Sequence, residues 1–271
     1  MLTTRLKASK GTLHVAPKPS DATKKYTAPA LSRGLDILEL LSSTPNGVTQ
    51  IEIARSLGRS PSEIFRVLKI LCERGYLELN LGNHCYALTP KMFEIAHRHP
   101  PIKRLTSVAA GPIQALADRL GQSLHLSIVQ SGCVQVIWHA QCVDEELVFS
   151  VRLGAQETIH ESSAGLVHAA WMEERELAGL LSSSDSIDQS LTAAFISMLS
   201  RVRREGSAET ESTVLVGVTN VSVPIFNGSG VAIASLTIPF VHTLPGRTKP
   251  SLVEARAELI ALGGWISQRL R

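Results

Sequence analysis

The chain has 271 residues, of which 44% are hydrophobic and 19% charged, and its formal net charge is +3. This length favours two domains with packed cores, whereas so small a net charge does not by itself indicate a nucleic-acid partner. No apolar run reaches the ~18 residues of a membrane-spanning helix, and no apolar segment follows the basic N-terminus as in a secretory signal. We therefore expect a cytoplasmic protein with no membrane partner.

The cysteine pattern argues against two classes of stabilised fold. The four cysteines lack CxxC spacing and a nearby histidine ladder, so neither structural zinc nor a disulfide framework is expected. They are Cys72, Cys85, Cys133 and Cys142. We expect no metal and no cofactor.

Residues 1–27 are predicted to be a flexible basic tail, because they combine Pro, Thr and Ala with basic residues and the single acid Asp21. The basic residues are Arg5, Lys7, Lys10, Lys18, Lys24 and Lys25. Such a tail can add salt-dependent attraction to phosphates, or it can be a terminus without a role. The sequence leaves both readings open.

Residues 28–90 begin with two helices. Ser32 is the expected N-cap of the first, and the segment 45–47, Pro-Asn-Gly, ends it. Its apolar positions are Leu35, Ile37, Leu38, Leu40 and Leu41. The second helix, 50–57, follows a capping box of Thr49 and Glu52. It is expected to pack through Ile51, Ala54 and Leu57, with Gly58 in the turn that follows.

A third helix is predicted over 61–74. Ser60 is its expected cap, Pro61 occupies the first helical position, and Glu63 completes a second capping box. Buried positions are expected at Ile64, Val67, Leu68 and Leu71. Alternating segments at 76–79 and 84–88 flank a turn and predict a hairpin. Helices and hairpin in this order predict a winged helix-turn-helix that binds DNA.

The third helix would lie in the major groove of double-stranded DNA. Ser62 and Arg66 are candidates for base edges, and Lys69 and Arg59 for phosphates. Thr49, at a helix N-terminus, can hold a phosphate, and the N-cap Ser60 is a further candidate for DNA contact. Asn83 and His84 at the wing tip can reach a sugar or phosphate. The alternative for each residue is a solvated surface position.

A short helix with Thr89 as its cap and Pro90 at its start is predicted next, and the proline pair at 100–101 is expected to end it. Residues 91–103 are read as a linker helix and a candidate dimer contact. Residues 104–271 are predicted to form an α+β domain. Its expected helices are 104–121, 165–171, 174–181, 189–204 and 249–270, and its expected strands are 123–129, 133–139, 146–151, 214–223 and 230–239.

From about residue 28 to the end, the chain resembles the IclR family of bacterial transcriptional regulators. The motifs that carry this resemblance are SRGLDILELLSS, EIARSLGRSPSEIFRVLKILCERGYLE, YALTPKMFEIA, VRLGAQETIHESSAGLVHAAW and VTNVSVPIFNGSGVAIASLTI. The resemblance implies a winged helix-turn-helix, a linker helix and a GAF-like effector-binding domain. It also implies a homodimer or homotetramer on a palindromic operator, acting as repressor or activator of a catabolic operon.

The family's effector pocket takes small organic acids or aromatic metabolites. Matched by motif position, its lining here would be Ser163, Ala164, Asn220, Thr237 and Pro239. The chain departs from the family pattern at Thr158, Leu166 and Pro239, and Pro61 and Glu63 replace residues that commonly contact DNA. The resemblance therefore fixes neither the ligand nor the operator.

The sequence leaves two other functions to consider: an enzyme, and a regulator whose C-terminal domain binds no effector. An enzyme could use Cys133, Cys142 or Ser162 with a histidine, but no nucleophile elbow, phosphate loop or metal-ligand cluster accompanies them, so we expect no enzyme. In the other alternative, the C-terminal domain only oligomerises.

Overall fold

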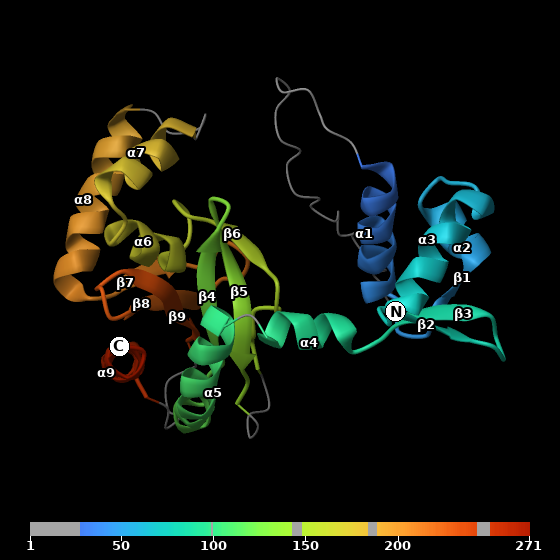
Figure 1. The fold of residues 1–271 in the computed structure, drawn as a ribbon. Helices are drawn as coiled ribbons and strands as arrows, with labels where there is room; N and C mark the ends of the chain where they lie inside the picture. The colour runs from blue at the N-terminus through green and yellow to red at the C-terminus, as the bar shows by residue number, and fades with distance from the viewer. Residues whose placement is uncertain (1–27, 99, 143–147, 184–188, 243–249) are drawn as a thin grey trace, which may run out of the picture. The chain divides into compact units, whose positions relative to one another are not determined.

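The computed structural model describes residues 28–98, 100–142, 148–183, 189–242 and 250–271. The predicted basic tail, 1–27, lies outside the described residues. The chain divides into two compact units, 1–95 and 96–271, and each is described by itself (Figure 1).

The described residues of the N-terminal unit form three helices, the start of a fourth (α4, Lys91–Arg98) and a small antiparallel sheet with strand order β1-β3-β2. Its elements are α1 (Pro29–Ser42), β1 (Val48–Thr49), α2 (Gln50–Ser56), α3 (Pro61–Glu73), β2 (Leu77–Asn80) and β3 (Cys85–Leu88). The helices bury one apolar face each, and the hairpin closes the core. Its large buried side chains include Ile37, Leu41, Ile53, Ile64, Leu68 and Leu77. The predicted winged helix-turn-helix is confirmed.

Both capping boxes are present in the structure. The Thr49 side chain caps α2 with Glu52, and the Ser60 side chain caps α3 with Glu63. Gly58 has a φ of 62°, the left-handed conformation expected of the residue that ends α2. The capping boxes and Gly58 therefore predicted where α2 begins and ends and where α3 begins.

Three expectations for this unit were wrong. α1 begins at Pro29 with Ala28 as N-cap, so Ser32 lies inside its first turn. Leu35 and Ile51 were expected to be buried, yet they are 50% and 63% exposed; in α2, Ile53 fills the core instead. Strand β1 was not anticipated, because two residues are too short to show an alternating pattern.

The C-terminal unit is built on one antiparallel sheet with strand order β6-β5-β4-β9-β8-β7. Its strands are β4 (Leu124–Gln130), β5 (Cys133–Ala140), β6 (Gln156–Thr158), β7 (Ala208–Glu211), β8 (Val218–Phe226) and β9 (Ala232–Val241). Its helices are α5 (Pro100–Leu120), α6 (Ser163–Ala170), α7 (Glu174–Ser183), α8 (Gln189–Glu205) and α9 (Leu252–Arg269), and α4 (Lys91–Arg98) precedes them. The α+β class is confirmed.

The two faces of this sheet have different neighbours. α5 and α9 cover one face, with α6, α7 and α8 on the other side (Figure 1). Successive side chains of β8 point to opposite faces of the sheet. On one face, Val221, Val223 and Ile225 join the apolar core against α5 and α9. Asn220 and Ser222 therefore point to the face that α6 covers.

Several element boundaries in this unit differ from expectation. The proline pair at 100–101 begins α5 rather than ending the preceding helix, since proline suits a first turn. The strand expected at 146–151 is not formed at 148–151, and 143–147 lie outside the described residues. The strand expected from 214 starts at Val218, and β6 and β7 were not anticipated.

Within the described ranges, no helix is long and apolar enough to cross a membrane.

Candidate nucleic-acid interface and effector pocket

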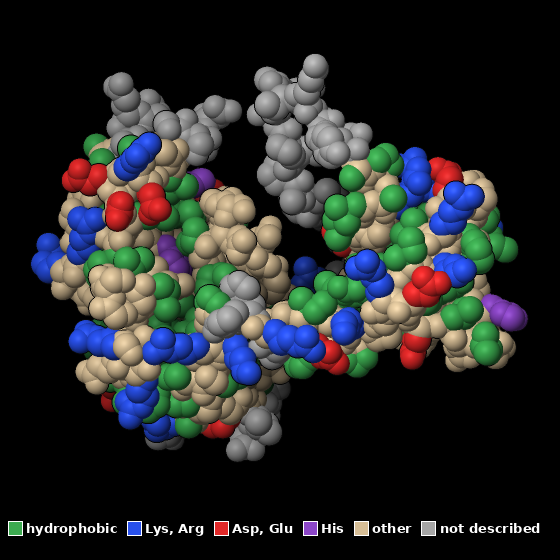
Figure 2. All heavy atoms as spheres, in the orientation of Figure 1, with side chains coloured by type: hydrophobic (Ala, Val, Ile, Leu, Met, Phe, Trp, Pro, Cys, Tyr) green, Lys and Arg blue, Asp and Glu red, His purple; other side chains and the backbone are tan. Residues whose placement is uncertain are grey.

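The surface of α3 that faces away from the core carries polar and basic side chains. Ser62, Arg66 and Lys69 are exposed, whereas Ile64 and Leu68 on the opposite side are fully buried. Basic and acidic side chains are interspersed with hydrophobic ones on the visible face of this unit (Figure 2). The sequence-predicted contact residues of α3 therefore share one accessible helix face.

The capping carboxylates of Glu52 and Glu63 occupy the N-cap hydroxyls of Thr49 and Ser60, so these hydroxyls are less available to a DNA phosphate. Thr49 Oγ1 donates to Glu52 Oε2 at 2.6 Å, and Ser60 Oγ donates to Glu63 Oε2 at 2.8 Å. Hydrogen bonds from Thr49 lower the pKa of Glu52, and hydrogen bonds from Ser60 lower the pKa of Glu63. A negative charge therefore occupies each helix N-terminus, which disfavours a phosphate at Thr49 or Ser60.

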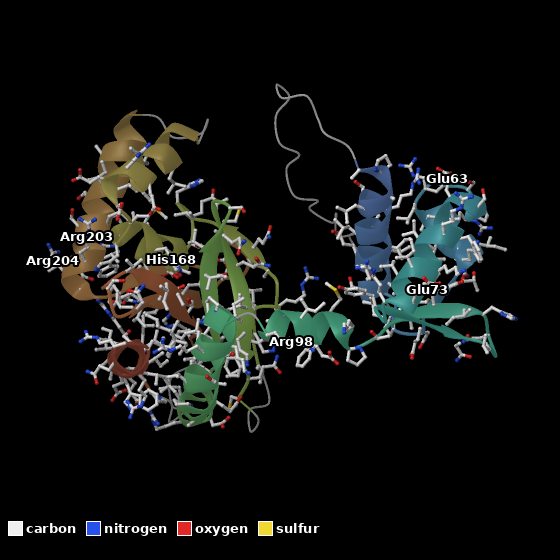
Figure 3. All side chains as sticks on the ribbon, viewed as in Figure 1. Glu63, Glu73, Arg98, His168, Arg203 and Arg204 are labelled. Atoms are coloured by element: carbon white, nitrogen blue, oxygen red, sulfur yellow. The ribbon has the colours of Figure 1, made fainter. Side chains whose placement is uncertain are left out.

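Two residues that sequence reasoning missed hold the start of α3 in place. Arg33 of α1 forms an ion pair with Glu63, with 3.3 Å between Arg33 Nη2 and Glu63 Oε1. Gln50 Nε2 donates to the Pro61 carbonyl at 2.9 Å. Figure 3 shows Glu63 and Glu73 near the two ends of α3. No periodicity signals such tertiary contacts, so the sequence alone could not find them.

The remaining predicted contacts lie at the surface of the same unit. Arg59 is exposed in the turn between α2 and α3, and Asn83 and His84 are exposed between β2 and β3. Asn83 Oδ1 accepts from the Cys85 backbone N–H at 3.1 Å, and His84 has a φ of 56°. Asn83 thus shapes the wing tip, and the His84 side chain remains at the surface.

In the C-terminal unit, the predicted effector residues gather where α6 covers the sheet. Ser163 Oγ and Ser222 Oγ are 2.7 Å apart, and Ser222 Oγ and Thr237 Oγ1 are also 2.7 Å apart. Asn220 and Pro239 are register partners on β8 and β9. Ala164 is buried in the apolar cluster between α6 and α8. Ser222, which links Ser163 to Thr237, was not anticipated.

A cavity of about 460 Å³ opens beside this patch, and Asn220, Thr158 and Ser162 are among its lining residues. Ser163, Ala164, Thr237 and Pro239 are not in its described lining. Ser162 accepts a hydrogen bond from the Gly165 N–H at 3.0 Å and donates to the Thr158 carbonyl. These contacts make Ser162 the N-cap of α6 rather than a free nucleophile.

The charge on the cavity wall is negative. Three carboxylates line it, from Glu157, Glu161 and Glu211, and no lysine or arginine is among its described lining residues. Thr158 Oγ1 donates to Glu161 Oε2 at 2.6 Å, and burial raises the pKa of Glu157. Leu166, another departure from the family pattern, is buried and packs in the apolar cluster of α6. The wall favours hydrogen-bond donors over anions.

The described part of the chain contains no cluster of three or more His, Cys, Asp or Glu side chains placed to hold a metal ion.

Comparison with known proteins identifies both units. Residues 30–80 match the IclR helix-turn-helix domain, and residues 102–260 match the C-terminal domain of the bacterial transcriptional regulator IclR. The chain is 28% identical over 247 residues to the HTH-type transcriptional regulator XynR of Escherichia coli, covering 89% of this chain and 96% of XynR. It is 27% identical to BhcR of Paracoccus denitrificans, over 77% of this chain and 76% of BhcR.

Two solved structures are similar along nearly the whole chain. HmgR of Pseudomonas aeruginosa has a TM-score of 0.71 at 25% identity, covering 89% of this chain and 98% of HmgR. An IclR homolog from Microbacterium hydrocarbonoxydans, complexed with 4-hydroxybenzoate, has a TM-score of 0.72 at 20% identity, covering 89% of this chain and 99% of the homolog. The second likeness establishes the fold only.

Proposed function

The chain belongs to the IclR family of bacterial transcriptional regulators, and from this premise we propose that α3 reads an operator whose occupancy a small-molecule effector controls. The observation that carries the proposal is the exposed face of Ser62, Arg66 and Lys69 on a helix whose other face is buried. The family assignment favours regulation over catalysis. It also favours a catabolic operon as the target.

In this proposal the roles on DNA follow from side-chain chemistry. Arg66 and Ser62 meet base edges in the major groove, while Lys69 and Arg59 neutralise phosphates. Asn83 and His84 contact the DNA backbone from the wing. Thr49 and Ser60 contribute mainly by fixing the ends of α2 and α3, because their hydroxyls are bonded to capping carboxylates.

We propose that the operator is a palindrome bound by a homodimer or homotetramer. Apolar side chains exposed on α1 and α4 support self-association, since Leu31 is 64% and Met92 44% exposed. The test is selection of the full-length chain on randomised duplex DNA. We expect enrichment of inverted half-sites about one helical turn, or a multiple of it, apart. Enrichment of single sites or of no sequence would contradict the palindromic reading.

We propose that the effector binds in the cavity beside Asn220 and is a compact, hydroxylated aromatic metabolite. The three wall carboxylates support a ligand whose polar groups donate hydrogen bonds. The Microbacterium homolog, which has the same fold, is complexed with 4-hydroxybenzoate, a hydroxylated aromatic compound. Among the family's aromatic and acidic ligands, the wall charge disfavours those that must bury a carboxylate against it.

A thermal-shift comparison separates this proposal from a domain that only oligomerises. 4-Hydroxybenzyl alcohol and 4-hydroxybenzoate share a ring and a hydroxyl and differ in the carboxylate. We expect the alcohol to raise the unfolding temperature more than the acid, and Asn220→Ala to reduce the shift. If neither these compounds nor related hydroxylated aromatics produce a shift at millimolar concentration, the result counts against this effector site and favours a C-terminal domain that only oligomerises.

A further inference from the structure

A second cavity, of about 810 Å³, lies at the other end of α6. Its lining shares no described residue with the cavity beside Asn220. Most of its wall is apolar and comes from β4, α7, β9 and the segments beside them. The principal apolar lining residues are Val129, Ile159, Met172, Leu180, Val231 and Ile233. A cavity of this size with apolar walls suits a small organic ligand.

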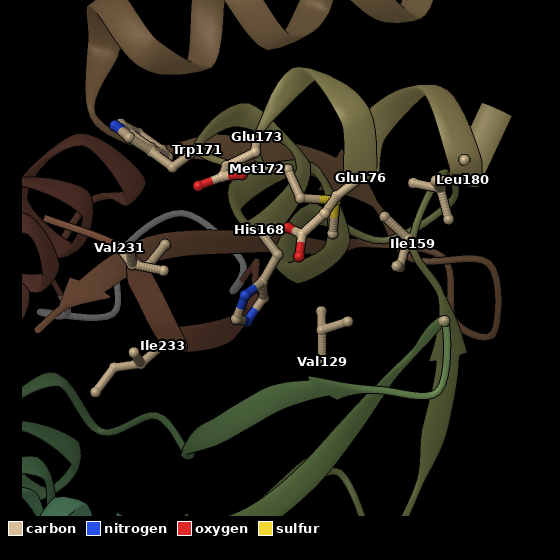
Figure 4. Close-up of a pocket in the computed structure, with 13 residues that line it drawn as sticks. Val129, Ile159, His168, Trp171, Met172, Glu173, Glu176, Leu180, Val231 and Ile233 are labelled. Atoms are coloured by element: carbon tan, nitrogen blue, oxygen red, sulfur yellow. The ribbon is translucent and has the colours of Figure 1, made fainter. Parts of the chain in front are cut away.

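One polar side chain points into this cavity from α6. The imidazole of His168 lies between Val129 on one side and Val231 and Ile233 on the other (Figure 4). His168 is only 5% exposed, and its Nε2 atom is buried and makes no hydrogen bond of normal geometry with the described residues. The backbone of Ser127 and Ala232 lies close enough to the ring to oppose the effect of burial on its pKa. An unpaired buried nitrogen is unfavourable, so a ligand atom that hydrogen-bonds it would be favoured.

The pairing of β4 and β9 explains why there is space for the His168 imidazole beside these strands. β4 and β9 are paired in register from His125 to Ser127 on β4, and β4 continues to Gln130 without pairing with β9 beyond Ser127. The two strands therefore stop exchanging hydrogen bonds just before Val129 and Ile233. The cavity occupies the side of this unpaired stretch that faces α6 and α7.

The charges at the cavity select for a cation. Glu173 and Glu176 line it, and both are exposed and form no ion pair within the described residues. No lysine or arginine is among the described lining residues. Burial lowers the pKa of His168 to about 4, so the imidazole is neutral at pH 7. An ammonium group would find two carboxylates, whereas a carboxylate would find no positive partner.

We propose that this cavity is a second small-molecule site, separate from the effector pocket, for a compact aromatic or branched aliphatic molecule that carries an ammonium group. The apolar body lies between Val129, Met172 and Leu180. The ammonium group lies near Glu173 and Glu176. A second polar atom of the ligand hydrogen-bonds His168 Nε2.

The test is calorimetric titration of the full-length chain with tyramine and with 3-(4-hydroxyphenyl)propionate. Both carry a phenol hydroxyl that can hydrogen-bond His168 Nε2, and the second compound has a carboxylate in place of the ammonium group. We expect measurable binding of the amine and at least tenfold weaker binding of the acid. The double variant Glu173→Gln, Glu176→Gln should weaken amine binding about threefold to thirtyfold, as expected for two partly exposed ion pairs. The matched control is Glu174→Gln, in the same turn of α7 but outside the cavity lining, and it should bind like the wild type.

His168→Phe should also lose amine binding, because it replaces the imidazole by a larger ring without nitrogen. The glutamine variants keep the test decisive if this buried substitution unfolds the domain. The proposal is overturned if the amine does not bind, if the acid binds equally well, or if the glutamine pair has no effect. Asn220→Ala should leave amine binding unchanged. If the amine does not bind, the proposal of operator binding is not affected, because operator binding is measured in a separate experiment.

Discussion

At the scale of single residues, two buried histidines make the C-terminal unit sensitive to acid. His125 on β4 and His168 on α6 are 3% and 5% exposed. The pKa of each is lowered to about 4, mainly by burial, and the nearby His139 contributes to the lowering for His125. Both rings are therefore neutral in the folded chain, whereas in the unfolded chain they gain a proton near pH 6.5.

We expect the free energy of unfolding to fall as the pH is lowered from 7.5 to 5.5. Between the unfolded pKa of about 6.5 and the folded pKa of about 4, the unfolded state binds more protons, so stability is full above the unfolded pKa and is lost toward the folded one. The loss to pH 5.5 should be about 1.4 kcal/mol for each histidine. Urea unfolding followed by tryptophan fluorescence measures it, because Trp138, Trp171 and Trp265 all belong to the C-terminal unit.

His168→Leu supplies the control for this pH dependence. It should lower stability at pH 7.5 through altered packing, yet halve the change between pH 7.5 and 5.5. An unchanged slope in this variant would mean that His168 titrates normally in the folded chain.

At the scale of elements, α6 depends on a close approach that only glycine permits. A Cβ atom at Gly165 would overlap the carbonyl oxygen of Ile159, just before the Ser162 cap. This contact seats the N-terminus of α6 between the sheet and α8. The position of Ser163 over Ser222 follows from it.

Gly165→Ala should lower the free energy of unfolding of the C-terminal unit by about 1–3 kcal/mol, or more if the backbone cannot shift. The matched substitution Gly264→Ala in α9 meets no atom within 4 Å and should stabilise by up to about 1 kcal/mol, because alanine favours helix. Urea unfolding of both variants measures the contrast. Equal effects at the two sites would show that α6 is not tightly seated.

The elements that could be predicted from the sequence are those with local signals. Thr49 and Ser60 marked two helix starts, because a capping box is formed by residues three apart. Leu35 and Ile51 were misplaced, because an apolar residue at the margin of a stripe can face either core or solvent. β6 and β7, with three and four residues, gave no alternating pattern and depend on pairing with distant strands.

The residues of the candidate sites also fall into two groups: those that a local sequence pattern predicts and those that only the tertiary structure brings together. Ser62, Arg66 and Lys69 share a helical face that periodicity could place. Only the family motif could select Asn220, Thr237 and Ser163, because their proximity comes from strand register and from the packing of α6. The unpaired stretch of β4 beside His168 has no sequence signature.

At the scale of the whole molecule, the net charge of +3 is too small to mark a DNA-binding protein. In the function that we propose, recognition depends instead on a few basic side chains that lie on one exposed helix face. In α3, Lys69 lies 3.8 Å from Glu73 in an exposed pair, which is weak and leaves the ammonium group available to a phosphate. Arg66 is free of such an ion pair within the described residues. The two side chains should therefore affect DNA binding differently.

The central claim is best tested by the affinity of the full-length chain for its selected operator and for base-substituted versions, measured by fluorescence anisotropy across a salt series. We expect Arg66→Ala to cost about 1–3 kcal/mol and to flatten the preference between versions. Lys69→Ala should weaken all versions alike and reduce the salt slope by about 1. Arg175→Ala, on exposed α7 in the other unit, should have no effect. Unchanged affinity and preference in Arg66→Ala would contradict the assignment of α3 as the recognition helix.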